Sequence, residues 1–290
     1  MKRSWLAAIA LLATATAWGA TFTLVKNVLA KIDPEPYIFY RFTLAGLLLI
    51  ALASARRLLS RPLVLPGLAL GILVFTGFWL QTEGLILISP ARSAFLTSLY
   101  VVLVPFCDRL LVGTRVSLSA WVASILALVG TGIMIGGFLG RPTVGDLLTL
   151  ACALVFSVHV VLTARYASRH SAIGLAAVQV LFVGLLAAPF SIASRQPQFT
   201  SNVVWVIVFT AVVTTALAFA ALTWGQAHVS ATQAAVILSF EPVAAAITSI
   251  VWYHEPMTRG FIGGAVLILA AMLVSQLPGR RPSESAKSRA

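Results

Sequence analysis

The sequence predicts an all-α polytopic membrane protein with ten transmembrane helices in two inverted five-helix repeats. Three observations lead to this fold class. The 290 residues are 60% hydrophobic and 10% charged, with a mean hydropathy of +0.99, whereas roughly a quarter of the residues in soluble domains are charged. Apolar runs of membrane-spanning length follow one another along the chain. The second half of the sequence also repeats features of the first.

Each predicted span is a mostly apolar run of about 20 residues, the length that an α-helix needs to cross the hydrocarbon core. Backbone polar groups in lipid must pair within their own segment, so the runs are expected to be helices. Proline, glycine and charged residues collect between them, as in Asp33–Pro36 and His254–Pro256. In order, the runs are Trp5–Val25, Tyr37–Ala53, Leu68–Ile88, Ala94–Val112, Leu118–Phe138, Leu147–Thr163, Ala172–Ile192, Val203–Leu222, Ala234–Trp252 and Phe261–Leu277.

Lys and Arg are distributed unequally between the two sides of this topology. The positive-inside rule makes the richer side cytoplasmic, which places both termini in the cytoplasm. The net charge of +12 is thus interpreted as loops facing an anionic lipid surface, not as a nucleic-acid-binding face. The cytoplasmic set is Lys2, Arg3, Arg56, Arg57, Arg61, Arg109, Arg115, Arg165, Arg169, Arg280, Arg281, Lys287 and Arg289, and the opposite set is Lys26, Lys31, Arg92, Arg141, Arg195 and Arg259.

The repeat appears when the chain is aligned with itself. At an offset of 138, Ala17–Thr21 falls on Val155–His159, and at an offset of 141, Ser89–Arg92 falls on Ser230–Gln233. Since each half holds an odd number of spans, the second half enters the membrane from the opposite side, an arrangement typical of transporters. The expected divisions are a first repeat at 1–140, a second, inverted repeat at 141–278 and a disordered cytoplasmic tail at 279–290.

The beginning of the chain allows a second interpretation. Met1, Lys2 and Arg3 followed by an apolar stretch are also the pattern of a secretory signal, which would be cleaved before Ala20. The first span nevertheless has a counterpart in the second half, which a discarded peptide would not need. We therefore expect it to be part of the folded protein.

Several short motifs follow one another along nearly the whole chain. They are Trp18-Gly19, Arg41, Gln81–Leu85, Ser93–Tyr100, and Glu241-Pro242 with Glu255 after it. In this order and spacing they resemble the EamA branch of the drug/metabolite transporter superfamily. The resemblance implies ten helices in two inverted halves and export of amino acids and other small metabolites across the bacterial inner membrane. Thr114 departs from the family's pattern, since the family often carries an acid at this position, where the second half has Glu255.

Glu241 is the acidic residue predicted to lie deepest in the membrane. A charge within a span costs roughly 2.5–3.5 kcal/mol on insertion scales, so it needs a partner or a watery cavity. Pro242 has no N–H to donate to the Leu238 carbonyl, which predicts a kink with polar backbone at membrane depth. One interpretation is a site for a coupling proton or a substrate amine. The other is a structural carboxylate bonded to a neighbouring helix.

Aromatic, amide and imidazole side chains lie on the spans that, by the resemblance, line a central cavity. Aromatic rings hold apolar or cationic groups without a fixed hydrogen-bond pattern, and amides both donate and accept. His159 is also a candidate for proton exchange, with a core histidine as the alternative. The candidate cavity residues are Trp18, Phe22, Trp79, Gln81, Phe95, Tyr100, His159, Trp224, Gln226 and Gln233.

Three charged residues are predicted near the extracellular ends of their spans. Glu83 and Arg92 flank one turn, which predicts a salt bridge that Arg41 could join. Two roles stay open for these charges: anchoring the helices at the interface, or forming a gate that opens and closes with access. Pro105 predicts a hinge or a packing irregularity in the fourth span, and Pro242 a kink in the ninth.

These features predict a secondary transporter that exports small amino-acid-like or amphipathic metabolites. The expected partners are a small-molecule substrate, the lipid bilayer and a coupling proton, without a metal or cofactor. An enzyme is not expected, because motifs such as His-Glu-x-x-His are absent from the sequence. A channel or facilitative uniporter and a non-transporting scaffold are the alternatives. Cys107 and Cys152 lie inside apolar runs, which predicts buried free thiols.

Overall fold

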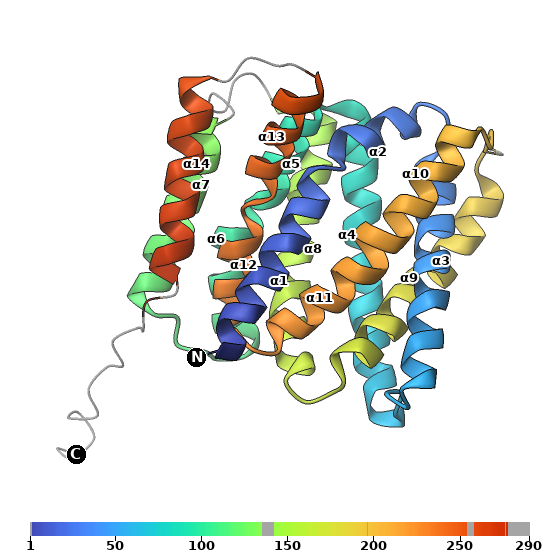
Figure 1. Ribbon diagram of the computed structural model, residues 1–290, viewed down its shortest axis with the longest axis horizontal. Coiled ribbons are helices and arrows are strands. Elements are labelled where there is room, and N and C mark those ends of the chain that lie inside the picture. The colour runs from blue at the N-terminus through green and yellow to red at the C-terminus, as the bar shows by residue number, and fades with distance from the viewer. Residues whose placement is uncertain (1, 135–141, 196, 254–257, 276, 278–290) are drawn as a thin grey trace.

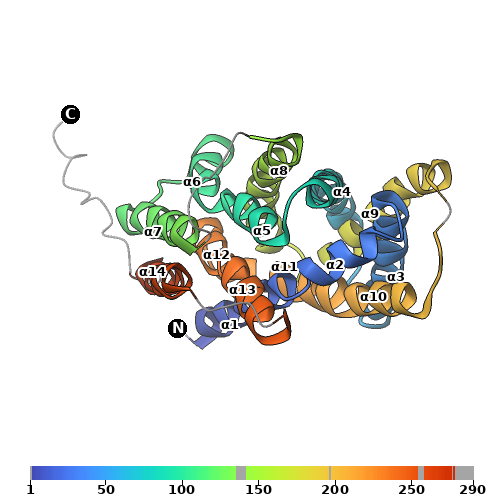
Figure 2. The same cartoon turned by 90° about the horizontal axis from the view of Figure 1, so that it is seen from above.

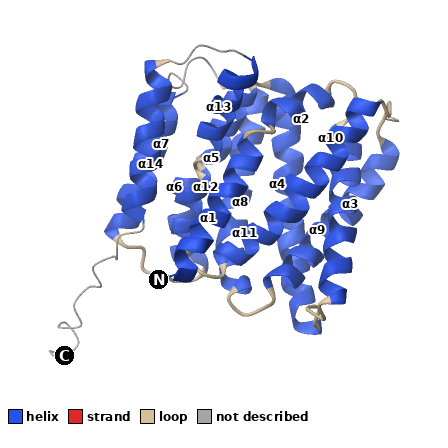
Figure 3. Cartoon of the chain, in the orientation of Figure 1, coloured by secondary structure: helices blue, strands red, loops and turns tan. Residues whose placement is uncertain are grey.

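The computed structural model describes the chain except for residues 1, 135–141, 196, 254–257, 276 and 278–290. The predicted junction at 140/141 and the predicted tail at 279–290 lie outside the described residues, as do Arg141 and Glu255. Within the described part, every regular element is a helix (Figure 3). The all-α fold class is therefore confirmed.

The first half of the chain crosses the bundle five times. In the described residues it consists of α1 (Lys2–Gly19), α2 (Phe22–Leu29), α3 (Pro34–Ala55), the 3-10 turn η1 (Arg61–Leu63), α4 (Val64–Leu87), α5 (Pro90–Ser98), α6 (Tyr100–Leu111) and α7 (Leu118–Met134). The pairs α1/α2 and α5/α6 each form one broken span (Figure 1).

The second half also crosses five times. Its described elements are α8 (Val144–Ala167), α9 (Ala172–Ala193), α10 (Ser201–Ala211), the π-helical segment η2 (Val212–Leu217), α11 (Ala218–Gln226), α12 (Ala231–Leu238), α13 (Glu241–Tyr253) and α14 (Arg259–Ser275). Here α10, η2 and α11 form one span and α12 and α13 another. Eight of the described spans are long and apolar enough to cross a membrane, and Leu118–Ile133 and Ile262–Ser275 are shorter apolar helices. The ten predicted runs correspond to these ten segments.

Helix starts follow from short polar side chains in the connections. Ser89, Ser171, Thr200 and Ser230 each accept a hydrogen bond from a backbone N–H of the first helical turn. Thr143 does the same within a complete capping box at the start of α8. These caps satisfy N–H groups that have no partner inside the helix, which stabilises helix ends that lie close to lipid.

Small residues let the helices approach closely. A Cβ atom at Gly46 of α3 would lie 2.8 Å from the Leu181 side chain of α9, and one at Gly184 of α9 would lie 2.8 Å from the Thr43 nitrogen of α3. Close backbone contact of this kind is the usual source of helix association in membranes. Seen from above, α7 and α14 form a separate pair at one edge of the bundle (Figure 2).

The first helix is part of the bundle. It packs against α11, α12 and α13, and its residues Leu11 and Ala15 are fully buried. The beginning of α1 and the end of α14 lie at the same end of the bundle (Figure 1). Cys152 is a buried free thiol, as predicted, whereas the free thiol of Cys107 is only partly buried.

Two broken spans occupy matching positions in the two halves. The span α5/α6 breaks at Leu99, and the span α12/α13 breaks at Ser239 and Phe240. The self-alignment at an offset of 141 pairs Ser98 with Ser239, so the breaks coincide with the proposed repeat. Pro105 lies inside α6, which continues through it. The interruption of the fourth span is thus six residues before Pro105, where a hinge or a packing irregularity was predicted.

Candidate functional site

A pocket lies between the two halves and encloses about 790 Å³ of space, part of it open to the outside. Its walls come from α1 to α6 of the first half and from α8, α11, α12 and α13 of the second. Pockets between the helices of a bundle are common small-molecule sites. The aromatic wall residues are Trp18, Phe22, Phe78, Tyr100, Phe156 and Phe219, and the polar ones are Thr21, Arg41, Gln81, Thr82, Thr97, His159 and Glu241.

The π-helical segment η2 supplies a polar centre to the span α10–α11. A π-turn changes the pattern of backbone hydrogen bonds, which makes a carbonyl available to side chains. The Thr214 carbonyl accepts a hydrogen bond from the Trp18 indole nitrogen at 2.8 Å and one from an Arg41 guanidinium nitrogen at 3.3 Å. Trp18 and Arg41 belong to the first half, so this carbonyl joins the halves beside the pocket.

Arg41 lies in the pocket wall and is 5% exposed. Its Nε donates to the Thr215 hydroxyl at 2.7 Å, and its Nη2 donates to the Thr214 hydroxyl at 3.0 Å. The expectation that Arg41 joins a salt bridge with Glu83 and Arg92 is wrong in this structure. Its long side chain extends from the second turn of α3 to the middle of the span Ser201–Gln226, where η2 holds it.

Glu241 begins α13, directly after the break in its span, and is 4% exposed in the pocket wall. Its placement depends on Gly19, because a Cβ atom there would clash with the Glu241 carbonyl and lie 2.8 Å from the Ala244 Cβ. Pro242 occupies the second position of α13, where a missing N–H costs nothing. Nearby, the Tyr100 hydroxyl is buried and has no hydrogen-bond partner among the described residues.

Hydrogen bonds and close packing close the bundle beneath the pocket, toward the beginning of α1. The His159 Nε2 lies 2.9 Å from the Gln179 Oε1 and 3.2 Å from the Thr163 hydroxyl, and the Gln226 amide donates to the Val160 carbonyl at 3.2 Å. A Cβ atom at Gly225 would lie 2.8 Å from the Leu11 Cγ, so α11 and α1 meet there without a gap.

Half of the predicted cavity residues line the pocket: Trp18, Phe22, Gln81, Tyr100 and His159. The other five lie elsewhere. Trp79 is 37% exposed and stacks with Phe75 and Phe190, and Phe95 is buried in a cluster with Ile88 and Leu96. Trp224 packs against His228, with ring centroids 4.7 Å apart. Gln226 lies beneath the pocket, and Gln233 caps α12 and donates to the Ser275 carbonyl at 2.8 Å.

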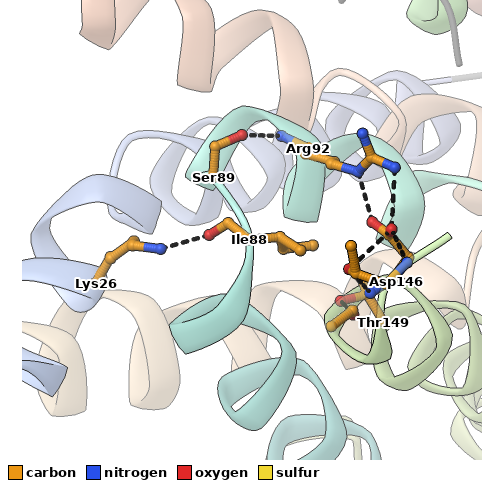
Figure 4. A network of polar contacts seen from close by, with 8 residues as sticks. Lys26, Ile88, Ser89, Arg92, Asp146 and Thr149 are labelled. Carbon is orange, nitrogen blue, oxygen red and sulfur yellow. Dashed lines mark hydrogen bonds and ion pairs between the residues drawn. The ribbon is translucent and has the colours of Figure 1, made fainter. Parts of the chain in front are cut away.

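The corner between α4 and α5 is held from two sides (Figure 4). The Lys26 ammonium group donates to the Ile88 carbonyl at 2.5 Å and to the Leu85 carbonyl at 2.9 Å. A cation at the C-terminal carbonyls of α4 is favoured by the helix dipole. On the other side, the Arg92 Nε and Nη2 donate to the Asp146 carboxylate at 2.5 and 2.9 Å.

The predicted salt bridge between Glu83 and Arg92 is replaced by this pair of Arg92 with Asp146, the ion pair present among the described residues. Glu83 instead lies beside Glu35 and Trp79. The reason is the direction of α5, which carries the Arg92 side chain toward the beginning of α8. The capping box Thr143-x-x-Asp146 was a sequence signal for an ordered carboxylate there, and the sequence interpretation missed it.

A comparison with protein-family models finds a match to the EamA-like transporter family at residues 5–136 and again at 143–276. The chain belongs to this family. A transporter of Archaeoglobus fulgidus is 30% identical over 90% of this chain and 82% of its own length. The transporter YvbV of Bacillus subtilis is 26% identical over 88% of this chain and 86% of its own length. These EamA relatives indicate a multi-pass membrane transporter, and they point away from an enzyme.

The EamA fold also matches a solved structure. A crystal structure superposes with a TM-score of 0.79 at 22% identity, covering 94% of this chain and 98% of the other. Identity at this level shows the fold alone. The pocket of this EamA protein is therefore described from the residues that line it in this chain.

Proposed function

We propose that this protein is a secondary transporter that exports small organic metabolites by alternating access around the pocket. The observation that carries the proposal is the position of the pocket. It lies between the two halves, at the breaks in α1/α2, α5/α6 and α12/α13 and beside the π-turn of α10–α11. Discontinuous helices around a site between inverted repeats are typical of secondary transporters.

The two ends of the bundle differ as alternating access requires. The pocket wall extends to Val25 of α2 and Leu85 of α4, toward one end of the bundle. At the other end, Gly225 packs directly on Leu11. Hydrogen bonds there join His159 to Gln179 and the Gln226 amide to the Val160 carbonyl. We infer that this conformation admits solutes from the α2 end and that transport requires α1 and α11 to separate.

The pocket wall favours a small molecule with an apolar body. Aromatic rings cover much of it, and two of its polar side chains, Gln81 and Thr97, bond to each other at 3.1 Å. Edge and face contacts with rings accept many apolar shapes. An amphipathic or amino-acid-like metabolite fits this surface better than a highly charged nucleotide.

Glu241 is the proposed coupling site. Its carboxyl group makes no hydrogen bond or ion pair with the described residues, and it lines the pocket at a helix break. A carboxyl group there can exchange a proton or hold a substrate amine whenever the pocket is reached from either side. His159 also lines the pocket, but Gln179 and Thr163 already bind its Nε2.

The orientation and repeat boundaries are part of the same proposal. Both termini lie on the cytoplasmic side of the inner membrane. The repeats at 1–140 and 141–278 rock against each other during transport. In that orientation the pocket of this structure faces the outside, and Gly225 lies at the cytoplasmic end. The excess of Lys and Arg on the side of the termini supports this placement.

Exchange in liposomes tests the proposal. An unbiased metabolite comparison between cells with and without the protein first identifies the exported metabolite. We then expect that unlabelled metabolite on the far side of the membrane accelerates uptake of labelled metabolite into proteoliposomes. A carrier shows this acceleration because a loaded site returns faster than an empty one. A channel would conduct without trans-acceleration, and a scaffold would give no uptake above empty liposomes.

A further inference from the structure

The charge of Arg41 has no counter-charge among the described residues. Its hydrogen-bond partners are the uncharged oxygens of Tyr37, Thr214 and Thr215. The rings of Phe42 and Phe78 lie 5.3 and 5.0 Å from its guanidinium carbon. These groups fix the guanidinium in position while its full positive charge stays unneutralised.

The depth of this charge makes the missing anion significant. The guanidinium bonds to Thr214 and Thr215, which lie at the middle of the span Ser201–Gln226. A buried cation at membrane depth is costly unless an anion or water accompanies it. Ring faces and hydroxyl groups offset only part of that cost. The pocket is the route by which an anion can reach Arg41.

The geometry leaves donors for such an anion. A guanidinium has five N–H groups, and η2 engages those on Nε and Nη2. Nη1 makes one long contact, 3.3 Å to the Tyr37 hydroxyl. At least one N–H of Nη1 is therefore available on a side chain that lines the pocket.

We infer that Arg41 is an anion-binding subsite that takes the carboxylate of the transported molecule. This inference rests on the proposed transport role of the pocket. Arg41 is the one Lys or Arg among the residues that line it, which suits a single negative charge better than a phosphate ester. Glu241 does not occupy the subsite, since the described residues contain no ion pair between it and Arg41. The subsite would set specificity, because a substrate without a carboxylate leaves the guanidinium unpaired.

Binding of a matched pair of probes tests the subsite without transport. The probes are 3-phenylpropionate and 3-phenylpropionamide, which share the aromatic body and differ in charge, titrated calorimetrically into the full-length protein in nanodiscs. We expect the carboxylate to bind about ten-fold or more tightly than the amide, as is typical of hydrogen bonds to charged groups. Arg41→Gln should remove this preference, and Arg41→Lys should keep part of it. The control Arg195→Gln changes an exposed arginine outside the pocket and should keep the whole preference.

Two results would overturn the assignment. One is a wild-type protein that binds both probes equally or binds neither. The other is a folded Arg41→Lys or Arg41→Gln variant that retains the wild-type preference. If Arg41→Gln fails to fold, the assignment is tested by the probe preference of the wild-type protein and of Arg41→Lys. Trans-acceleration in liposomes without any carboxylate preference would leave the transport function standing and reject Arg41 as its anion subsite.

Discussion

Glu241→Gln is expected to abolish gradient-driven export while leaving exchange of metabolite between the two sides of the membrane largely intact. Glutamine has nearly the same size and keeps the polar end of the side chain, but it cannot carry a proton. A carrier with this change can still bind, turn and release substrate. It can no longer couple that movement to a proton gradient. The measurement is transport into proteoliposomes with and without an imposed pH difference.

The matched control is Glu83→Gln, which removes the carboxylate of a residue near the end of α4 that does not line the pocket. This variant should keep both driven transport and exchange. Driven accumulation at the wild-type level by Glu241→Gln would reduce Glu241 to a structural residue at the start of α13. Loss of driven transport and exchange together, in a folded protein, would make it a substrate-binding residue instead of a coupling residue.

Gly225→Leu is expected to open the end of the bundle where the chain begins. The added side chain would overlap Leu11, and overpacking of this kind costs about 1–3 kcal/mol. If the cost falls mainly on the conformation seen here, the ratio of the two access states shifts by about 5- to 150-fold. A cysteine at Val160, in the pocket wall near this end, should then be labelled faster from that side.

Gly132→Leu is the control, because a Cβ atom at Gly132 has no heavy atom within 4 Å. Both variants are made with Cys107→Ala and Cys152→Ala, so that the introduced cysteine is the thiol being labelled. Equal labelling rates for Gly225→Leu and Gly132→Leu would show that the contact between α1 and α11 does not gate the pocket. A lowered melting temperature without a change in labelling would assign Gly225 to packing alone.

The sequence predicted the fold well for identifiable reasons. Membrane spans are long apolar runs, and their ends carry polar caps such as Ser89 and Ser230. A kink in the ninth span was predicted from Pro242, and that span breaks just before Glu241. The break at Leu99 was not, because neither Leu99 nor Tyr100 disfavours a helix. Its counterpart in the second half is the break at Ser239 and Phe240.

The candidate site was harder to predict, because the rotation of each helix about its axis decides which of its side chains face the pocket. Trp79 and Gln81 are two residues apart on α4, yet Trp79 faces outward and Gln81 faces the pocket. The sequence interpretation placed Arg41 near the extracellular end of its own helix. In the structure its guanidinium is held by the π-helical segment of another span. No composition or spacing rule marks Thr214 and Thr215 as the residues that bind it.

The most direct test of the central claim, that substrate passes through this pocket, is modification of a thiol on its wall. Gln81→Cys, with Cys107→Ala and Cys152→Ala, places a thiol beside Thr97, and Leu87→Cys places one on the exposed surface of α4. A bulky methanethiosulfonate reagent should block transport by Gln81→Cys and not by Leu87→Cys, and the exported metabolite should slow the reaction at position 81. Undiminished transport by fully modified Gln81→Cys would contradict the account.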